Sequence, residues 1–158
     1  PGPRSDAVIR QCKAVMCVSR GAAHGVGIAA NQVGGGLRVF RVDYPDHEGE
    51  PTVAHVINPV LEPPVERRLD EDSEGCLSVP GPYADLARPA RATVRGVDVD
   101  GNEVVLEGTG LLARCLQHEC DHLDVQVYTE RLSATARKRV LNELAEPGAA
   151  PWLMEAEA

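Results

Sequence analysis

A short segment near residue 120 has the residue types and the spacing of a hydrolytic metal site. It reads His118-Glu119-Cys120-Asp121-His122. On an α-helix the two histidines share one face, so both imidazoles can reach a single divalent cation. Glu119 lies beside them, placed to accept a proton from water at the ion. The pattern predicts metal-assisted hydrolysis, provided that the segment is helical and that a third ligand exists.

Candidates for the third ligand lie on both sides of this segment. A hydrolytic metal usually takes three protein ligands and leaves a fourth position for water. Downstream, Glu143 and Glu146 do not match the pattern of the common zinc proteases. Upstream, Glu74-Gly75-Cys76-Leu77-Ser78 holds a cysteine, whose thiolate binds zinc and ferrous iron strongly. Farther upstream, residues 25–32 combine small residues, which permit close backbone approach, with a terminal amide that donates hydrogen bonds.

Together these three motifs resemble the peptide deformylase family. A chance His-Glu-x-x-His occurs on the order of once in a few hundred chains of this size and does not decide the question alone. The glycine-alanine stretch, the Glu-Gly-Cys-Leu-Ser segment and the His-Glu-x-x-His motif, in this order from Gly25 to His122, are highly specific. Similar residues such as Asn58-Pro59-Val60-Leu61 extend the resemblance over most of the chain.

The resemblance implies a metal centre and a general base. Cys76, His118 and His122 would bind one divalent cation, with Fe²⁺ expected first and Zn²⁺ or Ni²⁺ as alternatives. The ion would acidify its bound water. Glu119 would take the proton of that water and later deliver it to the departing amine.

The resemblance also implies the substrate and the groups that contact it. The substrate would be an N-formylmethionyl peptide, deformylated during the N-terminal processing that accompanies protein biosynthesis, with release of formate. The side-chain amide of Gln32 and the backbone N–H of Leu77 would hold the oxyanion together with the metal. The methionine side chain would enter a pocket near Val26, Gly27, Leu111 and Cys115.

Two alternatives stay open beside this reading. A related amide hydrolase could act on another formylated small molecule, because only 24 residues precede Gly25 where the family has a longer lead-in. A non-catalytic metal-binding protein is the other alternative. Glu119 argues against it, since a purely structural metal site needs no base.

Length and composition narrow the class of protein. The 158 residues suffice for one domain, residues 1–158, and the net charge of −8 argues against a nucleic-acid binder. No apolar run approaches the ~20 residues that span a bilayer, and no signal-peptide pattern begins the chain. Five cysteines without regular spacing favour reduced thiols in a cytoplasm. The basic cluster of Arg131 and residues 137–139 could contact an acidic partner, and a transient ribosome contact is left open.

The elements that position these motifs follow from hydrophobic periodicity. Helices are predicted over residues 6–20, 110–123 and 133–144, the last capped by Ser133. Strands are predicted over residues 37–42, 53–57, 65–69, 92–99 and 103–107, with Asp100-Gly101-Asn102 joining the last two as a hairpin. The order predicts an α+β fold with antiparallel sheets packed around the metal helix and a C-terminal helix.

Residues around the metal motif have plainer roles. Cys120 points away from the ligand face and is predicted to pack in the core. Asp121 is predicted to orient a ligand or to pair with an arginine. Val125 stands where the family commonly has a glycine, and a left-handed conformation there would strain a branched residue.

Overall fold

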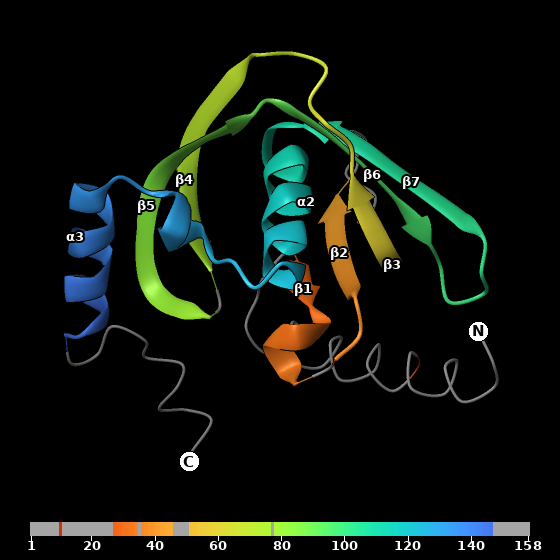
Figure 1. The fold of residues 1–158 in the computed structure, drawn as a ribbon, viewed down its shortest axis with the longest axis horizontal. Coiled ribbons are helices and arrows are strands. Elements are labelled where there is room, and N and C mark those ends of the chain that lie inside the picture. Colours follow the sequence, from red (N-terminus) through yellow and green to blue (C-terminus); the bar gives the residue numbers. More distant parts are fainter. Residues whose placement is uncertain (1–9, 11–26, 35, 46–50, 77, 147–158) are drawn as a thin grey trace.

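The computed structural model describes residue 10 and residues 27–34, 36–45, 51–76 and 78–146 (Figure 1). Apart from Arg10, the helix predicted over residues 6–20 lies outside the described residues, as do Val26 and Leu77. The strands are β1 (Gly27–Ala29), β2 (Val39–Pro45), β3 (Pro51–Leu61), β4 (Leu69–Cys76), β5 (Val79–Pro89), β6 (Arg91–Val97) and β7 (Glu103–Thr109). The helices are α2 (Gly110–Leu123) and α3 (Ala134–Leu144), with short 3₁₀ turns η1 (Ala30–Val33) and η2 (Tyr128–Arg131).

Two antiparallel sheets enclose α2. The larger sheet has the strand order β1-β2-β3-β6-β7, and the smaller sheet consists of β4 and β5. Figure 1 shows α2 between the two sheets and α3 on the far side of β5. The predicted α+β architecture, with its two helices and antiparallel sheets, is therefore confirmed. No helix in the described part of the chain is long and apolar enough to cross a membrane.

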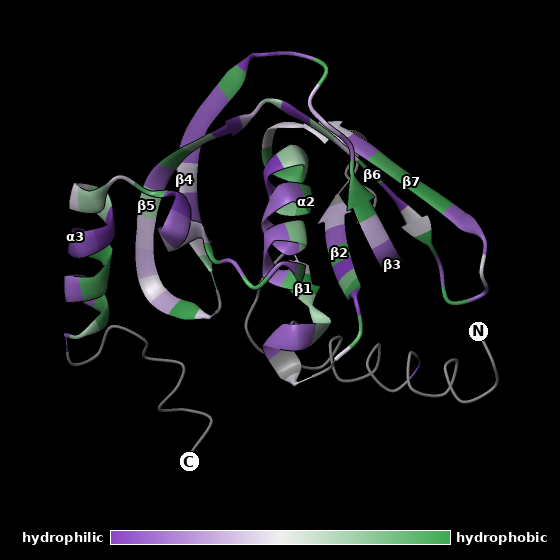
Figure 2. Cartoon of the chain, in the orientation of Figure 1, coloured by the Kyte–Doolittle hydropathy of each residue, from purple (hydrophilic) through white to green (hydrophobic). Residues whose placement is uncertain are grey.

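The core explains why α2 takes this central place. Its apolar residues recur with the helical period and pack against the larger sheet. Several of its polar residues, namely Arg114, His118 and Asp121, contact the smaller sheet, and Figure 2 shows this division along the helix. The main buried cluster consists of Ala29, Phe40, Val42, Val56, Ala92, Val94, Ala113, Cys115, Leu116, Cys120 and Leu123. The helix that bears the two histidines is thus held by apolar packing on one side and by polar contacts on the other.

Several predicted elements match the structure closely. The predicted helix over residues 110–123 has the bounds of α2. Ser133 caps α3, since its hydroxyl accepts a hydrogen bond from the backbone N–H of Ala136 at 3.2 Å. The predicted hairpin joins β6 to β7, with Gly101 at φ 85° in its turn. These three features depend on local sequence signals, and local signals sufficed to predict them.

The strand predictions were wrong in two regions. The strand over residues 53–57 does not stop at Asn58-Pro59: β3 continues to Leu61, because Asn58 at φ 50° forms an irregularity in the pairing with β6 that absorbs the proline. The strand predicted over residues 65–69 is also misplaced, since β4 begins at Leu69.

The strand β5 was not predicted at all. Its sequence contains three prolines and one glycine, residues that ordinarily argue against a strand. It nevertheless pairs with β4 along its length and buries alternate residues, including Ala84, Leu86 and Arg88. Tertiary contacts with α3 and α2 thus outweigh the local signals.

Candidate active site

The three residues predicted as metal ligands lie together in the structure. Cys76 ends β4, while His118 and His122 lie one turn apart on α2. The Sγ of Cys76 is 3.1 Å from Nε2 of His122, which is 3.0 Å from Nε2 of His118. Their ligand atoms all lie within 4.8 Å of one another. A thiolate with two imidazoles is a donor set that suits zinc or ferrous iron, so the residues present fit a divalent metal.

The electrostatics of these groups favour an ionised sulfur. Burial raises the pKa of the Cys76 thiol, but hydrogen bonds and charge from His118 and His122 outweigh it and lower the pKa to about 5. Burial lowers the pKa of His118, but Cys76, Glu74 and Glu119 together raise it to about 10. The backbone N–H of Ser78 also points toward the sulfur, at 3.4 Å. The cluster therefore prepares a thiolate, the form of cysteine that binds metals.

Glu119 is buried beside this cluster, with 3% of its surface exposed. Its Oε2 has no hydrogen-bond partner among the described residues. Burial raises the pKa of Glu119 to about 8, and the negative charges of Cys76 and Glu74 add to the effect while His118 opposes it. A buried carboxyl group with one uncommitted oxygen is poised to exchange a proton with a molecule bound next to it.

The glycine-alanine stretch lies against this carboxyl group. A Cβ atom at Gly27 would come within 2.7 Å of Oε1 of Glu119 and 2.9 Å of Sγ of Cys115. Such contacts are too close for any side chain, so Gly27 allows β1 to approach α2. Cys115 is 5% exposed and Leu111, one turn earlier on α2, is 51% exposed. Of the four predicted pocket residues, Leu111 and Cys115 thus lie on one side of α2, and Gly27 lies against Cys115.

The side chain of Gln32 is oriented by two hydrogen bonds. Its Oε1 accepts from the backbone N–H of Ala29 at 2.8 Å, so its Nε2 points the other way. That Nε2 donates to the hydroxyl of Ser78 at 3.1 Å and lies 3.9 Å from Sγ of Cys76. The structure thus places an amide donor next to the candidate metal ligands. Leu77, the second predicted oxyanion donor, lies outside the described residues.

Glu74 is a buried partner of the site that the sequence prediction missed. Its Oε1 accepts a hydrogen bond from Nδ1 of His118 at 2.7 Å. Its carboxylate also accepts two hydrogen bonds from Arg88, at 2.6 and 2.7 Å, and one from Arg114 at 3.0 Å. Burial raises the pKa of Glu74, but Arg88 and His118 outweigh it and lower the pKa to about 2. Glu74 therefore stays ionised and holds the His118 ring with Nε2 toward Cys76.

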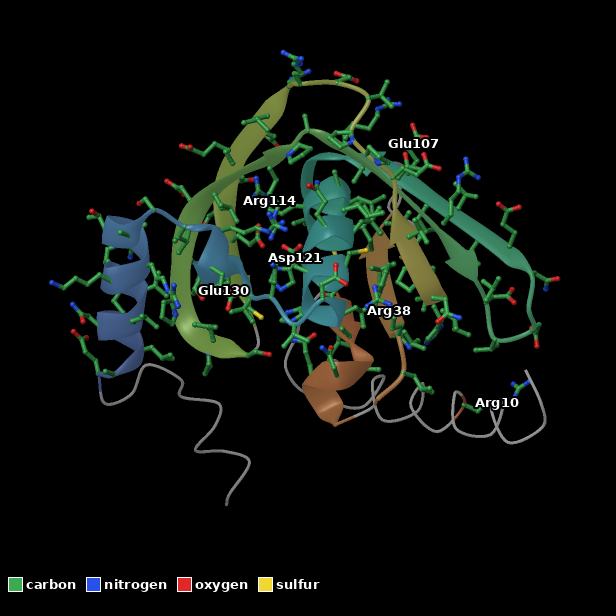
Figure 3. The ribbon with its side chains drawn as sticks, viewed as in Figure 1. Arg10, Arg38, Glu107, Arg114, Asp121 and Glu130 are labelled. Atoms are coloured by element: carbon green, nitrogen blue, oxygen red, sulfur yellow. The ribbon has the colours of Figure 1, made fainter. Side chains whose placement is uncertain are left out.

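The same hydrogen-bond network continues through Asp121 to Arg131 in η2. Arg88 also contacts Asp121 at 3.0 Å, and Arg131 forms two hydrogen bonds of 2.6 Å to Asp121. Arg114 donates to the backbone carbonyls of Leu86 and Asp70 at 2.8 Å. Figure 3 shows Arg114 and Asp121 reaching from α2 toward β4 and β5. The predicted pairing of Asp121 with an arginine is present.

Some of these contacts had a signal in the sequence. Glu74 belongs to the same short motif as Cys76, and Asp121 lies beside a histidine ligand. Arg88 carries no such signal, because it lies on the strand that was not predicted, whereas Arg114 lies one turn before His118 on the predicted helix. Arg131, part of the basic cluster, is engaged by Asp121 rather than free for a partner. Cys120 is buried in the core as predicted.

Comparison with known proteins identifies the family. The sequence model of the polypeptide deformylase family matches residues 3–138. Peptide deformylase 1 of Streptomyces avermitilis is 51% identical over 142 residues, which cover 89% of this chain and 66% of that protein. Peptide deformylase 2 of Streptomyces coelicolor is 45% identical over 146 residues, covering 91% of this chain and 78% of that protein.

The fold agrees with that assignment. The crystal structure of a peptide deformylase from Synechococcus elongatus in complex with actinonin superposes with a TM-score of 0.77 at 34% sequence identity, over 90% of this chain and 78% of that one. The match in sequence and the match in fold thus cover most of the chain. The chain belongs to the peptide deformylase family, whose enzymes remove the formyl group from nascent peptides.

Proposed function

We propose that this chain hydrolyses the formamide bond of N-formylmethionyl peptides and releases formate. The observation that carries the proposal is the convergence of Cys76, His118 and His122 beside the buried carboxyl group of Glu119. Three ligands leave room for water and substrate, and a base next to them has a role only in catalysis. The proposal also rests on membership of a family of metal-dependent deformylases.

Cys76, His118 and His122 would hold one divalent cation, with Fe²⁺ expected first and Zn²⁺ or Ni²⁺ as alternatives. When bound, such a cation lowers the pKa of water toward about 7 and polarises the carbonyl of the formyl group. Glu74 supports this assignment, because it fixes the ring of His118 through Nδ1. The mixed donor set of one sulfur and two nitrogens argues against magnesium or calcium, which prefer oxygen ligands.

Glu119 would act as the general base and then as the general acid. Its uncommitted Oε2 accepts a proton from the attacking water and later gives that proton to the departing amine nitrogen. Burial supports both steps, because a pKa raised to about 8 lies near neutral pH, where a carboxyl group can both accept and release a proton. Gly27 packs against the same carboxyl group, which has little contact with bulk solvent.

Gln32 and Leu77 would stabilise the oxyanion that forms at the formyl carbon. The Gln32 amide is suited to this role, since its oxygen is bound to Ala29 N–H and its nitrogen faces Cys76. Donors that are oriented before the reaction lower the barrier without reorganisation. The methionine side chain of the substrate would lie near Val26, Gly27, Leu111 and Cys115.

The composition supports a cytoplasmic setting for this reaction. The described cysteines, Cys76, Cys115 and Cys120, form no disulfide with one another. Thiols persist in a reducing compartment, which is also where nascent formylated peptides are made. A transient contact with the ribosome belongs to the same proposal, because the substrate emerges there.

A formate-release assay on a formyl-Met peptide tests the proposal. The purified, iron-loaded chain is expected to release formate, and Glu119→Ala is expected to lose at least about 10²-fold in kcat. Actinonin, which is bound in the Synechococcus elongatus structure, is expected to inhibit the reaction. Equal rates for wild type and Glu119→Ala would contradict the mechanism. Faster turnover of a formylated small molecule than of the formyl-Met peptide would contradict the proposed substrate.

A further inference from the structure

Two side chains from the segment that follows β1 donate hydrogen bonds to the C-terminal end of α2, which bears His122. Asn31 donates a hydrogen bond from Nδ2 to the backbone carbonyl of His122. Arg38 donates to the next carbonyl, that of Leu123, at 3.0 Å, and contacts the carboxylate of Asp124 at 3.1 Å. The last carbonyls of a helix lack intrahelical partners, so donors from elsewhere can fasten them. Two neighbouring residues of α2 are therefore tied to residues 31 and 38.

Asn31 shares a single turn with Gln32. The turn η1 covers only Ala30–Val33 and ends at Gly34, whose φ of 82° reverses the chain. One turn has few hydrogen bonds of its own, so contacts outside it decide its position. Before the turn, Gly27 rests against Glu119 and Cys115. On the turn itself, Asn31 provides a side-chain hydrogen bond to the helix with the metal ligands.

This arrangement connects two parts of the reaction centre through the backbone. Gln32 carries the amide proposed to stabilise the oxyanion, and His122 is a proposed metal ligand. The hydrogen bond from Asn31 links the residue before Gln32 to the main chain of His122. Asn31 is itself exposed, and its amide bonds to a backbone carbonyl of α2 rather than to the thiol or rings of the cluster. Its contact therefore positions other groups and does not itself take part in the chemistry.

We propose that Asn31 is a positioning residue for deformylation, which ties η1 to the C-terminal end of α2 and so sets the distance between the Gln32 amide and the metal ligands. The inference rests on the proposed function. Stabilisation of an oxyanion depends steeply on the position of the hydrogen-bond donor. Removing one donor entirely lowers kcat by about 10²–10³-fold, so displacing a donor should cost part of that factor. Loss of the Asn31 bond should therefore lower kcat by about tenfold while KM changes little.

Steady-state kinetics on a formyl-Met peptide, with metal content and melting temperature measured on the same samples, tests the inference. Asn31→Ala removes the donor, and Asn31→Asp keeps the shape but replaces the donor with an acceptor that repels the carbonyl. Both variants are expected to lose about tenfold or more in kcat with the metal content unchanged. Arg38→Ala is the matched control, because it removes a donor from the adjacent carbonyl of the same helix end. It is expected to lower the melting temperature and to keep kcat within about twofold.

A double-mutant cycle separates positioning of Gln32 from a general loss of structure. If Asn31 acts through the Gln32 amide, then Asn31→Ala should lower kcat little further in a Gln32→Ala background. The inference would be overturned if Asn31→Ala lowered kcat by the same factor in the wild-type and Gln32→Ala backgrounds. It would also be overturned if Asn31→Ala left kcat unchanged, or if Arg38→Ala lowered kcat as much as Asn31→Ala does. A wild-type chain that releases no formate would instead overturn the proposed function, and this inference with it.

Discussion

Glu119 is a residue at which the proposed catalytic role and the stability of the fold oppose each other. Its pKa rises from 4.5 to about 8 because the folded protein buries its carboxyl group. Between these values the folded state binds a proton that the unfolded state releases, so the free energy of unfolding falls as pH rises from 4.5 through 8. The protein thus retains a destabilising group where the proposed mechanism requires a base, a trade-off that is common at active sites.

The variant Glu119→Gln should reveal this opposition. It is expected to lose about 10²–10⁴-fold in kcat, because glutamine cannot accept the proton. In metal-free protein at pH 9, where the wild-type carboxyl group must be buried as an anion, the variant should melt a few degrees higher, by about 3 °C or more. Thermal unfolding monitored by circular dichroism at pH 5 and pH 9 compares the melting temperatures with Glu119 protonated and with Glu119 ionised. A variant that melts at a lower temperature than the wild type at pH 9 would show that the carboxyl group of Glu119 does not destabilise the fold.

Val125 carries strain at the end of the same helix. It has a φ of 61° and is 84% exposed, so a branched side chain adopts the left-handed conformation without gaining burial. The backbone N–H of the next residue, Gln126, donates to the carbonyl of Asp121 at 2.9 Å, and this helix-ending bond requires the left-handed conformation at Val125. The predicted strain at this position is therefore present, and its relief should stabilise the protein.

Replacing Val125 by glycine is expected to raise the free energy of unfolding by about 1 kcal/mol. Glycine avoids the clash of the left-handed conformation, which costs about 1–2 kcal/mol, and loses part of this gain to its greater freedom in the unfolded chain. Urea denaturation at constant metal content measures the difference. Val125→Ala, which keeps the Cβ atom but not the branch, should gain less than the glycine variant. A less stable glycine variant would refute the assignment of strain.

At the scale of elements, a polar interface joins the smaller sheet to α2. Glu74 of β4 bonds to Arg88 of β5 and to His118 and Arg114 of α2. One carboxylate thus connects two strands to the helix and also orients a proposed metal ligand. The contacts are buried, so removing one partner leaves charges without compensation.

Glu74→Gln should therefore weaken metal binding as well as the fold. Glutamine keeps the size of the side chain but does not provide a negative charge for His118, and loss of such a partner typically costs 10–100-fold in metal affinity. Competition with a chromophoric chelator measures the affinity. Glu107→Gln is the matched control, since Glu107 pairs with Arg91 at the surface and should change the affinity by less than about twofold. Equal affinities for Glu74→Gln and wild type would contradict the positioning role of Glu74.

At the scale of the whole molecule, a bound metal would connect the two halves of the structure. Cys76 belongs to the smaller sheet, whereas the two histidines belong to the helix that packs on the larger one. A cation bound by the folded state alone adds RT ln(1 + [L]/Kd) to its stability, about 2.7 kcal/mol at a hundredfold excess over Kd. The bound metal is thus expected to stabilise the fold as well as to support catalysis.

Removal of the metal by a chelator should abolish activity and lower the melting temperature by several degrees. Adding Fe²⁺ under anaerobic conditions should restore both. Cys76→Ser, which replaces the sulfur ligand with a hydroxyl, should show the lower melting temperature and respond little to added metal. Scanning calorimetry with parallel metal analysis makes the comparison. A melting temperature unaffected by chelation would argue against a metal that links β4 to α2.

Prediction from the sequence succeeded where short-range patterns carry the information. The bounds of α2, the Ser133 cap and the hairpin at Gly101 depend on residues within a few positions of one another. It failed for β4 and β5, because an acidic strand and a strand with three prolines have weak local preferences and are held by each other, by α3 and by buried arginines. Pairing between distant residues, and not propensity, decides such strands.

The same division holds for the candidate site. The types of the chemical groups follow from the sequence, since the two histidines and the glutamate between them are specific in combination with the cysteine and glutamine motifs. How those groups are held depends on the folded chain: Glu74 lies behind His118, Gly27 lies against Glu119, and Asn31 donates to the carbonyl of His122. The physical reason is that ligand chemistry is a property of single side chains, whereas orientation and pKa depend on neighbours that only folding brings within hydrogen-bond distance.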